Sequence, residues 1–428
     1  MIDPQAKARP YIRLMIFVAI MGFVSAVITF IFITISNQLT ALVWDNLSPV
    51  LGLDPRIFTF IVCTLGGLLV GLLVKIFGDH NAIFFELLRE FGKTGRFNYR
   101  NAPGILLTAL VSLASGGSLG PEAPLADACG GLGTLASDKL NLDDNETRVM
   151  GYAGFSGMLG AFITNPFGGS LLTVEGAQAD QPREKVYFWG LFPSLLASAV
   201  ATVTFVLLTG AFFADLVEFP EYSPVLTDLL WAVPLSLVGA VAGILFMVMF
   251  MRLRKLMERF KDRLILRGLI GGLGMGIIGA LLPLTLFSGE EQTVTLIRHA
   301  AEIGIATLIL LAIAKLFATT LLLATGWKGG YIFPILFAGV ALGMAMEILV
   351  PGIPVAVTVA ATLAGALVAS LRAPLFAALF TLAFVEFKRA AVVAIAVLVS
   401  SLVVALITLR QARKADAQAQ PDEPMVGE

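Results

Sequence analysis

Residues 116–124 of this chain read Gly-Gly-Ser-Leu-Gly-Pro-Glu-Ala-Pro, and residues 324–334 read Ala-Thr-Gly-Trp-Lys-Gly-Gly-Tyr-Ile-Phe-Pro. Both stretches interrupt apolar sequence with Gly and Pro, and they align at a constant separation of 210 residues. The identical pairs are Ala114/Ala324, Gly116/Gly326, Gly120/Gly330, Pro124/Pro334, Leu132/Leu342 and Gly133/Gly343. An interruption repeated at corresponding positions of two hydrophobic halves is the best sequence indication of a transporter binding site.

A second set of matches supports an internal duplication. Four positions recur in the same order at a separation of 208 residues: Gly157/Gly365, Leu159/Leu367, Ala161/Ala369 and Pro166/Pro374. We therefore predict two repeats, approximately residues 55–215 and 225–410, that make up most of the chain.

The composition is that of a polytopic membrane protein. Of the 428 residues, 57% are hydrophobic and 14% are charged, and the mean hydropathy is +0.89. Soluble domains average about 25% charged residues. The net charge of −1 leaves no basic domain that could bind nucleic acid. Neither the two cysteines nor the two histidines follow a metal-ligand pattern. We expect an all-α membrane protein with no metal and no cofactor.

A helix needs about 20 apolar residues to cross the hydrocarbon core of a bilayer. The segments of suitable length are 11–35, 56–77, 187–214, 230–251, 265–288, 302–323, 352–371 and 389–409. Shorter apolar pieces, bounded by Gly, Pro or Asn, are 103–118, 121–138, 147–162, 166–176, 331–346 and 374–387. Broken helices at membrane depth are tolerated only where protein or a water-filled cavity surrounds their backbone. We therefore expect the long helices to wrap the short ones.

The distribution of Lys and Arg predicts the orientation, because cytoplasmic connections carry an excess of both. The basic groups are Lys7, Arg9 and Arg13; Lys93, Arg96 and Arg100; Arg252, Arg254, Lys255, Arg259, Lys261, Arg263 and Arg267; and Arg410, Arg413 and Lys414. We place these in the cytoplasm, together with the N-terminus (1–10) and a tail (411–428) that we predict to be disordered. The acidic connection with Asp215, Glu218, Glu221 and Asp228 should face outside. Residues 11–35 are predicted to be a retained span, not a signal peptide, because no cleavage site precedes them.

The glycine- and proline-containing stretches predict two helix N-termini. Proline fits the first turn of a helix, so a helix should start near Gly120-Pro121-Glu122, and another near Gly329-Gly330-Tyr331. A helix N-terminus carries free N–H groups and about half a positive charge. Two such ends meeting at the membrane centre would form an anion site without a buried lysine. The alternative is that Gly and Pro only allow close helix packing.

Glu122 is an ionisable residue at predicted membrane depth, which makes it a candidate functional residue. A carboxylate at a helix N-terminus could occupy an anion site when ionised, and leave it when protonated or displaced. Glu122 would then be a gate. The alternative is that Glu122 only caps its own helix at an exposed end.

These motifs resemble the CLC family of chloride channels and chloride/proton antiporters, in particular divergent bacterial-type members without C-terminal regulatory domains. Residues 116–124 resemble the family's Gly-Lys/Arg-Glu-Gly-Pro segment, and residues 329–334 resemble its Gly-Gly-x-Phe-x-Pro segment. Asn165-Pro166 is similar to the Asn-Ala-Pro helix start. The Arg-Ala-Pro-Leu sequence at 372–375 is identical to a recurrent family tetrapeptide, and Lys315 precedes the second motif. The resemblance covers residues 55–410.

The resemblance implies an inverted-repeat fold, a homodimer with one pore per subunit, and a location in the cell membrane, for a bacterium the inner membrane. It implies that chloride or another small anion is transported and that Glu122 is the external gate. Backbone groups around the anion would belong to Gly120, Pro121, Glu122, Ala123, Gly330, Tyr331 and Ile332, with the N–H groups of Tyr331 and Ile332 facing the central anion.

The sequence departs from the family pattern at three positions around the anion. The family's Gly-Ser-Gly-Ile-Pro motif is absent, and Asn81 stands near its serine; Asn81 either contributes to anion binding or only caps the next helix. Pro121 replaces the basic residue before the gating glutamate, and Lys328 either restores the positive potential or extends to water. Counting forward places the family's pore tyrosine near Phe387-Lys388, so Lys388 is a further anion-binding candidate.

The proton pathway of antiporters is not clearly encoded in this sequence. The family's inner glutamate corresponds to Gly176, which cannot carry a proton and favours passive conduction. Glu175 beside it, and Asp127 on the predicted helix of Glu122, remain candidates for proton transfer. The leading hypothesis is a chloride channel, and the alternatives are anion/proton exchange and fluoride selectivity. An intramembrane enzyme or a non-transporting membrane protein is a distant alternative, because no nucleophile–base pair accompanies the carboxylates.

Overall fold

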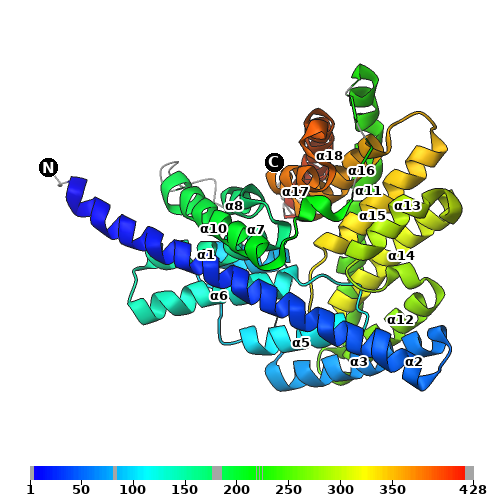
Figure 1. Cartoon of the computed structure of the whole chain (residues 1–428), viewed down its shortest axis with the longest axis horizontal. Coiled ribbons are helices and arrows are strands. Elements are labelled where there is room, and N and C mark those ends of the chain that lie inside the picture. The colour runs from blue at the N-terminus through cyan, green and yellow to red at the C-terminus, as the bar shows by residue number, and fades with distance from the viewer. Residues whose placement is uncertain are drawn as a thin grey trace, which may run out of the picture.

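The computed structural model describes residues 4–80, 84–175, 186–217, 219–220, 222–223 and 225–419, and it is helical throughout (Figure 1). The N-terminal half contains α1 (Pro4–Ala41), η1 (Leu42–Leu47), α2 (Ser48–Leu51), α3 (Pro55–Phe77), α4 (Phe84–Thr94), α5 (Ala102–Ala114), α6 (Glu122–Leu140), α7 (Asp144–Ile163), α8 (Pro166–Glu175), η2 (Tyr187–Leu191), α10 (Phe192–Thr209) and η3 (Phe213–Leu216). The C-terminal half contains α11 (Leu226–Met257), η4 (Glu258–Phe260), α12 (Leu264–Leu281), η5 (Pro283–Thr285), α13 (Glu290–Ile303), α14 (Ile305–Ala324), α15 (Ile332–Leu349), α16 (Val355–Leu371), α17 (Pro374–Val385), η6 (Phe387–Arg389) and α18 (Ala390–Ala419).

The predicted duplication is present as an inverted repeat. Helix follows helix in the same order in both halves, so that α5, α6, α7 and α8 correspond to α14, α15, α16 and α17. Gly120 and Gly330, which are equivalent in sequence, form an isolated antiparallel backbone bridge. Each donates its N–H to the carbonyl of the other, at 2.9 Å from Gly120 and 2.6 Å from Gly330. Equivalent residues can pair reciprocally in this way only if a local two-fold axis passes between them.

Glycine lets the equivalent helices α3 and α12 approach each other closely. A Cβ atom added at Gly67 would lie 2.8 Å from Cα of Gly272, and one added at Gly268 would lie 2.7 Å from Cα of Gly71. Small residues at a helix interface are the usual means of close packing in membranes, where lipid tails are as apolar as leucine. This contact joins the two repeats next to the predicted site.

Eight helices of the described chain are long and apolar enough to cross a membrane. Seven of them coincide with predicted spans. For two neighbouring helices, however, the prediction of which one is long enough to cross the membrane was the wrong way round. Ile332–Leu349 qualifies as a span, whereas Val355–Leu371 belongs to the shorter apolar helices. The reason is that the sequence pattern does not show α15 continuing to Leu349, three residues beyond its predicted end.

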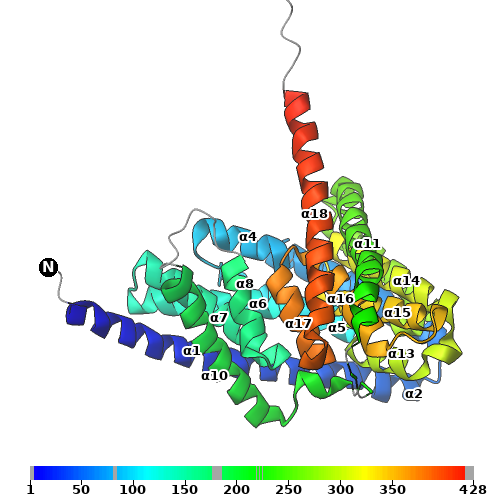
Figure 2. The ribbon, with the colours of Figure 1, turned by 90° about the horizontal axis from the view of Figure 1, so that it is seen from above.

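Of the pieces predicted to be short and interior, α6, α7 and α15 are mostly buried, whereas α5, α8 and α17 are only partly buried. Helix α16, which was predicted to be one of the outer spans, is instead buried along almost its whole length. The long helices α1 and α18 are at the outside, and α11 and α18 end on the same side of the molecule (Figure 2). Those ends carry Arg252, Arg254, Lys255 and Arg410, which were predicted to share one side of the membrane.

Candidate anion site at paired helix N-termini

The loops that lead into α6 and α15 have the same backbone conformation. Gly116 and Gly326 are equivalent, and both have a positive φ, of 81° and 93°. Each loop then folds back on the preceding helix, because the N–H of Gly117 donates to Ser112 and that of Trp327 donates to Leu322. L-residues rarely adopt such φ values, so the glycines fix this reversal. It directs both chains toward the Gly120–Gly330 bridge.

Helices α6 and α15 therefore begin side by side. Pro121 is the N-cap of α6 and Tyr331 is the N-cap of α15. Proline stands at the third helical position of each, as Pro124 and Pro334, and has no N–H. The free donors of each first turn are accordingly those of its first two helical residues.

The Glu122 carboxylate occupies the N-terminus of α15. Its Oε1 accepts the N–H of Ile332 at 2.7 Å and that of Phe333 at 3.4 Å. The residue is fully buried, and its Oε2 has no hydrogen-bond partner among the residues that the structure describes. Gly120 and Gly330 flank the carboxylate so closely that a Cβ atom at either position would overlap it. A carboxyl group from the start of α6 thus accepts the free N–H groups at the N-terminus of α15.

The comparisons with known proteins identify a family for the chain. A family model described as voltage gated chloride channel matches residues 66–405. The chain belongs to this family. It is 28% identical over 359 residues to the Escherichia fergusonii protein "Putative ion-transport protein YfeO", with 82% of each chain covered. The Shigella sonnei protein of the same name is 29% identical over 359 residues, also with 82% of each chain covered.

Solved structures show the same fold. A slow cyanobacterial Cl−/H+ antiporter superposes with a TM-score of 0.80 at 20% identity, covering 95% of this chain and 99% of the other. A CLC-type fluoride/proton antiporter gives a TM-score of 0.71 at 19% identity, with 91% and 95% covered. A eukaryotic CLC transporter gives 0.69 at 16% identity, with 92% and 72% covered.

Most of the predicted site residues of this CLC-family chain are brought together. Gly120, Pro121, Glu122, Ala123, Gly330, Tyr331 and Ile332 all lie at the two adjoining helix starts. The prediction missed Phe333, whose N–H is the second to reach Glu122. The position of the N-cap was the missing information: because Tyr331 is the cap, the first two helical N–H groups belong to Ile332 and Phe333.

Of the two other anion-binding candidates, one lies away from this cluster and one cannot be placed. Lys388 is exposed on the turn Phe387–Arg389, and the neighbouring Arg389, which is buried, donates to the carbonyl of Pro220 at 3.0 Å. Lys388 is therefore at the start of α18, at the end opposite to Arg410, beside the connection that was predicted to face outside. Asn81 falls outside the described residues.

The two carboxylates considered for proton transfer have different surroundings. Glu175 caps α17: its oxygens accept the N–H groups of Leu375 at 2.5 Å and Phe376 at 3.0 Å. Asp127 is 5% exposed on α6, and it accepts no hydrogen bond from the described residues. It interacts electrostatically with Lys328 and Glu90.

Lys328 does not extend to water, because only 5% of it is exposed. Its Nζ donates to Oδ1 of Asp79 at 3.4 Å and to the carbonyl of His80. Arg267 donates to the other oxygen of Asp79. Burial acts to raise the pKa of Asp79, but Lys328 and Arg267 outweigh it, so that the pKa is lowered from its ordinary value. No sequence motif pointed to Asp79, which is 249 residues from Lys328.

Lys315, noted in the sequence only for the resemblance, is a structural cation. It is fully buried, and its Nζ donates to the carbonyls of Thr285, Leu286 and Phe287 at 2.7–3.1 Å. It also lies 5.0 Å from the ring centre of Phe337. These carbonyls use all three of its donors, so Lys315 holds the segment after η5 against α14 and α15.

Proposed function

We propose that this protein conducts chloride, or a related halide, along a pathway formed by helix N-termini and backbone amides, as a channel gated by Glu122. The observation that carries the proposal is the position of the carboxylate, which accepts the N–H groups of Ile332 and Phe333 at the start of α15. A halide ion has the same charge and would accept hydrogen bonds from the same donors. Glu122 and the anion therefore compete for one place.

The unpartnered Oε2 supports movement of the gate. An ionised carboxylate with one buried oxygen lacking a partner is incompletely stabilised, since burying an unsatisfied polar atom costs about 1–3 kcal/mol. Protonation removes the charge that holds the side chain at the helix dipole, and a competing anion replaces it there. Either event opens the pathway.

Proton-coupled exchange is the second candidate. Asp127 favours it, being a buried carboxylate without a hydrogen-bond partner among the described residues, five positions beyond Glu122 on α6. Two of the similar solved structures are proton-coupled antiporters, one for chloride and one for fluoride. In this mechanism Glu122 exchanges protons on one side, and Asp127 or Glu175 does so on the other.

The remaining features of the proposal follow the family resemblance. The protein would act as a homodimer in the cell membrane, for a bacterium the inner membrane, with both termini in the cytoplasm. The basic ends of α11 and α18, on the same side of the molecule, support this orientation (Figure 2).

Halide efflux from liposomes that contain the purified protein, recorded together with external pH, tests the proposal. Chloride flux without proton movement supports a channel, and flux with opposed proton movement supports an exchanger. If fluoride leaves the liposomes and chloride does not, the fluoride-selective alternative holds. The absence of any halide flux would refute the proposed function.

A further inference from the structure

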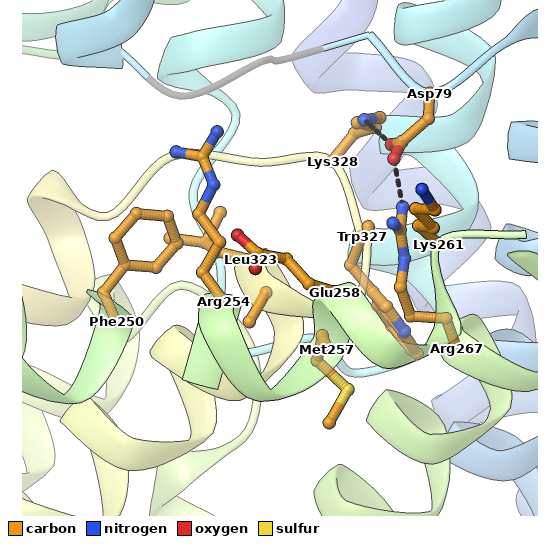
Figure 3. A pocket seen from close by; sticks show the side chains of 12 residues that line it. Asp79, Phe250, Arg254, Met257, Glu258, Lys261, Arg267, Leu323, Trp327 and Lys328 are labelled. Carbon is orange, nitrogen blue, oxygen red and sulfur yellow. Dashed lines mark hydrogen bonds and ion pairs between the residues drawn. The ribbon is translucent and has the colours of Figure 1, made fainter. Parts of the chain in front are cut away.

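Charged groups lie on both sides of the paired helix starts, and their surroundings differ. On the side where α11 ends, Lys328 and Arg267 both contact Asp79, and dashed lines join each of them to it in Figure 3. The cations there have a carboxylate partner of their own. On the side of α13, Glu290 interacts electrostatically with the carboxylate of Glu122. This second carboxylate has no role yet in the gate.

Helix α13 begins beside the first turns of α15. Its N-cap is Gly289, with a φ of 102°, and a Cβ atom added there would lie 2.9 Å from Cβ of Phe337. Phe337 is one helical turn beyond Phe333, about 5.4 Å along α15. The N–H of Phe333 is one of the two that Glu122 accepts. Glu290, the first residue of α13, is thus placed near the turn of α15 that binds the Glu122 carboxylate.

The segment before α13 is fixed to the loop that leads into α6. The N–H of Phe287 donates to the carbonyl of Gly116, in that loop, at 3.3 Å. Lys315 on α14 donates to three carbonyls of the segment, the nearest at 2.7 Å. One turn further along α14, the hydroxyl of Thr319 donates to the carbonyl of Ser118, in the same loop, at 2.8 Å. The start of α13 therefore cannot shift independently of the loop before α6.

Glu290 is partly exposed, whereas Glu122 is fully buried. Helix α13 lies toward the end of the molecule where α18 begins, away from the basic ends of α11 and α18 (Figure 2). In the proposed orientation this is the outer side of the membrane. A proton from the external water can therefore reach the Glu290 carboxylate, but it cannot reach the Glu122 carboxylate directly in this conformation.

The charged groups that face Glu290 are mostly acidic. Glu291 follows it on α13, Glu122 faces it from α6, and Lys315 faces the preceding segment from α14 with its donors used by carbonyls. Helix α15 contributes the uncharged Phe337. Burial raises the pKa of Glu290 to about 7, and the charges of Glu291 and Glu122 add to this effect. A carboxyl group with a pKa near the ambient pH can both accept and release a proton.

We propose that Glu290 is a proton relay between the external water and Glu122. The Glu290 carboxylate takes a proton from hydronium in the external water and passes it to the Glu122 carboxylate. Glu122 becomes neutral and leaves the N-terminus of α15, and Glu290 is ionised again. This role rests on the proposed function and deepens it, because the relay supplies the proton that opens the gate.

Exchange of radioactive chloride across liposomes, with equal chloride and equal pH on both sides, tests this without a need for oriented insertion. In the wild type, exchange should rise as the pH is lowered from about 8 to about 5, because Glu122 becomes protonated. Glu290→Gln should lower the rate at about pH 5 by about tenfold. This is less than the ~10²–10⁴ of a group that reacts directly, because water still protonates Glu122 slowly. Glu302→Gln, at a well-exposed carboxylate of the same helix, is the control.

A double substitution separates a relay from a structural role. In a Glu122→Gln background the gate needs no proton, so the addition of Glu290→Gln should leave chloride exchange unchanged. Glu290→Asp, which keeps the carboxyl group, should restore part of the rate at acidic pH. An equal loss of exchange in both backgrounds, or no loss in either, would overturn the relay.

Two further measurements cover a folding failure and a failure of the proposed function. If Glu290→Gln does not give a monodisperse protein, Glu290→Asp decides: its carboxyl group is further from Glu122, so an unchanged rate at acidic pH would contradict the relay. If the wild type carries no halide, the proposed function fails, and infrared spectroscopy in heavy water then follows deuterium exchange at the Glu122 carboxyl group. Slower exchange in the Glu290 variant than in the wild type supports the relay, and equal rates refute it.

Discussion

At the scale of single residues, the site depends on the missing side chains of Gly120 and Gly330. The Glu122 carboxylate fills the space that a Cβ atom would take at either glycine. The two glycines and the glutamate therefore form one unit, and changes at them should not be independent.

We predict that Gly330→Ala is strongly coupled to Glu122. In the wild type the added methyl group meets the carboxylate, and overpacking typically costs about 1–3 kcal/mol. In a Glu122→Ala background the methyl group has room, and most of that cost should disappear. Thermal melting of the four proteins of the cycle measures the coupling, with Gly168→Ala as control, because the nearest atom to an added Cβ there is 3.7 Å away. Equal losses of stability in both backgrounds would contradict the arrangement.

A second residue-scale prediction concerns Asp79. Its pKa is lowered in the folded protein by Lys328 and Arg267, against the opposing effect of burial. A lowered pKa adds stability above the unfolded-state value of about 3.9, and that stability is lost as the pH falls through the folded-state value. The melting temperature of the wild type should therefore fall more steeply below about pH 4 than that of Asp79→Asn. If the melting temperatures of the two proteins fall in parallel as the pH is lowered, the contacts of Asp79 do not contribute to stability.

The sequence allowed some of these residues to be predicted and not others, for a physical reason. Glu122 was identifiable because a carboxylate after Gly-Pro in an apolar region has few ordinary explanations. The role of Phe333 could not be predicted in the same way. Its N–H is free for Glu122 because Tyr331 is the N-cap of α15, and the position of an N-cap is set by backbone geometry. The Asp79–Lys328 contact joins positions 249 residues apart, and no local pattern encodes such a pairing.

At the scale of elements, the repeated broken helices were predictable from Gly and Pro, since these residues act on the backbone locally. The helices α6, α7, α8 and α17 begin within three residues of their predicted starts. Helix α15 runs to Leu349, beyond Glu347, where the apolar sequence is interrupted and the predicted helix ended. The length of a helix within the membrane is set by its packing against other helices, which the local sequence pattern does not predict.

Glu175, at the end of α8, connects the two repeats because its carboxylate caps the N-terminus of α17. We predict that Glu175→Ala lowers stability by about 1 kcal/mol, less than the ~1.5–3 kcal/mol of a buried charged hydrogen bond, because the residue is only partly buried. Glu302→Ala, at a well-exposed carboxylate, is the control. Melting temperature and proton movement should be measured together. Loss of proton movement without loss of stability would contradict a capping role and assign Glu175 to proton transfer.

At the scale of the whole molecule, the orientation in the membrane is open to a direct test, because Cys63 and Cys129 are both free and fully buried. Single cysteines introduced at exposed positions should therefore report their own side. In intact cells a membrane-impermeant maleimide should label Asp215→Cys and leave Lys255→Cys unlabelled until the membrane is opened. The reverse pattern would invert the proposed topology.

The central claim is that the Glu122 carboxylate and the transported anion compete for the N-terminus of α15. Chloride efflux from liposomes, with external pH recorded, tests it most directly when wild type and Glu122→Gln are compared. We predict that the wild type carries chloride and that the substitution, which keeps the size of the side chain but removes its charge, opens the pathway, raising chloride flux and abolishing any opposed proton movement. Identical chloride and proton fluxes in the two proteins would show that Glu122 is not the gate.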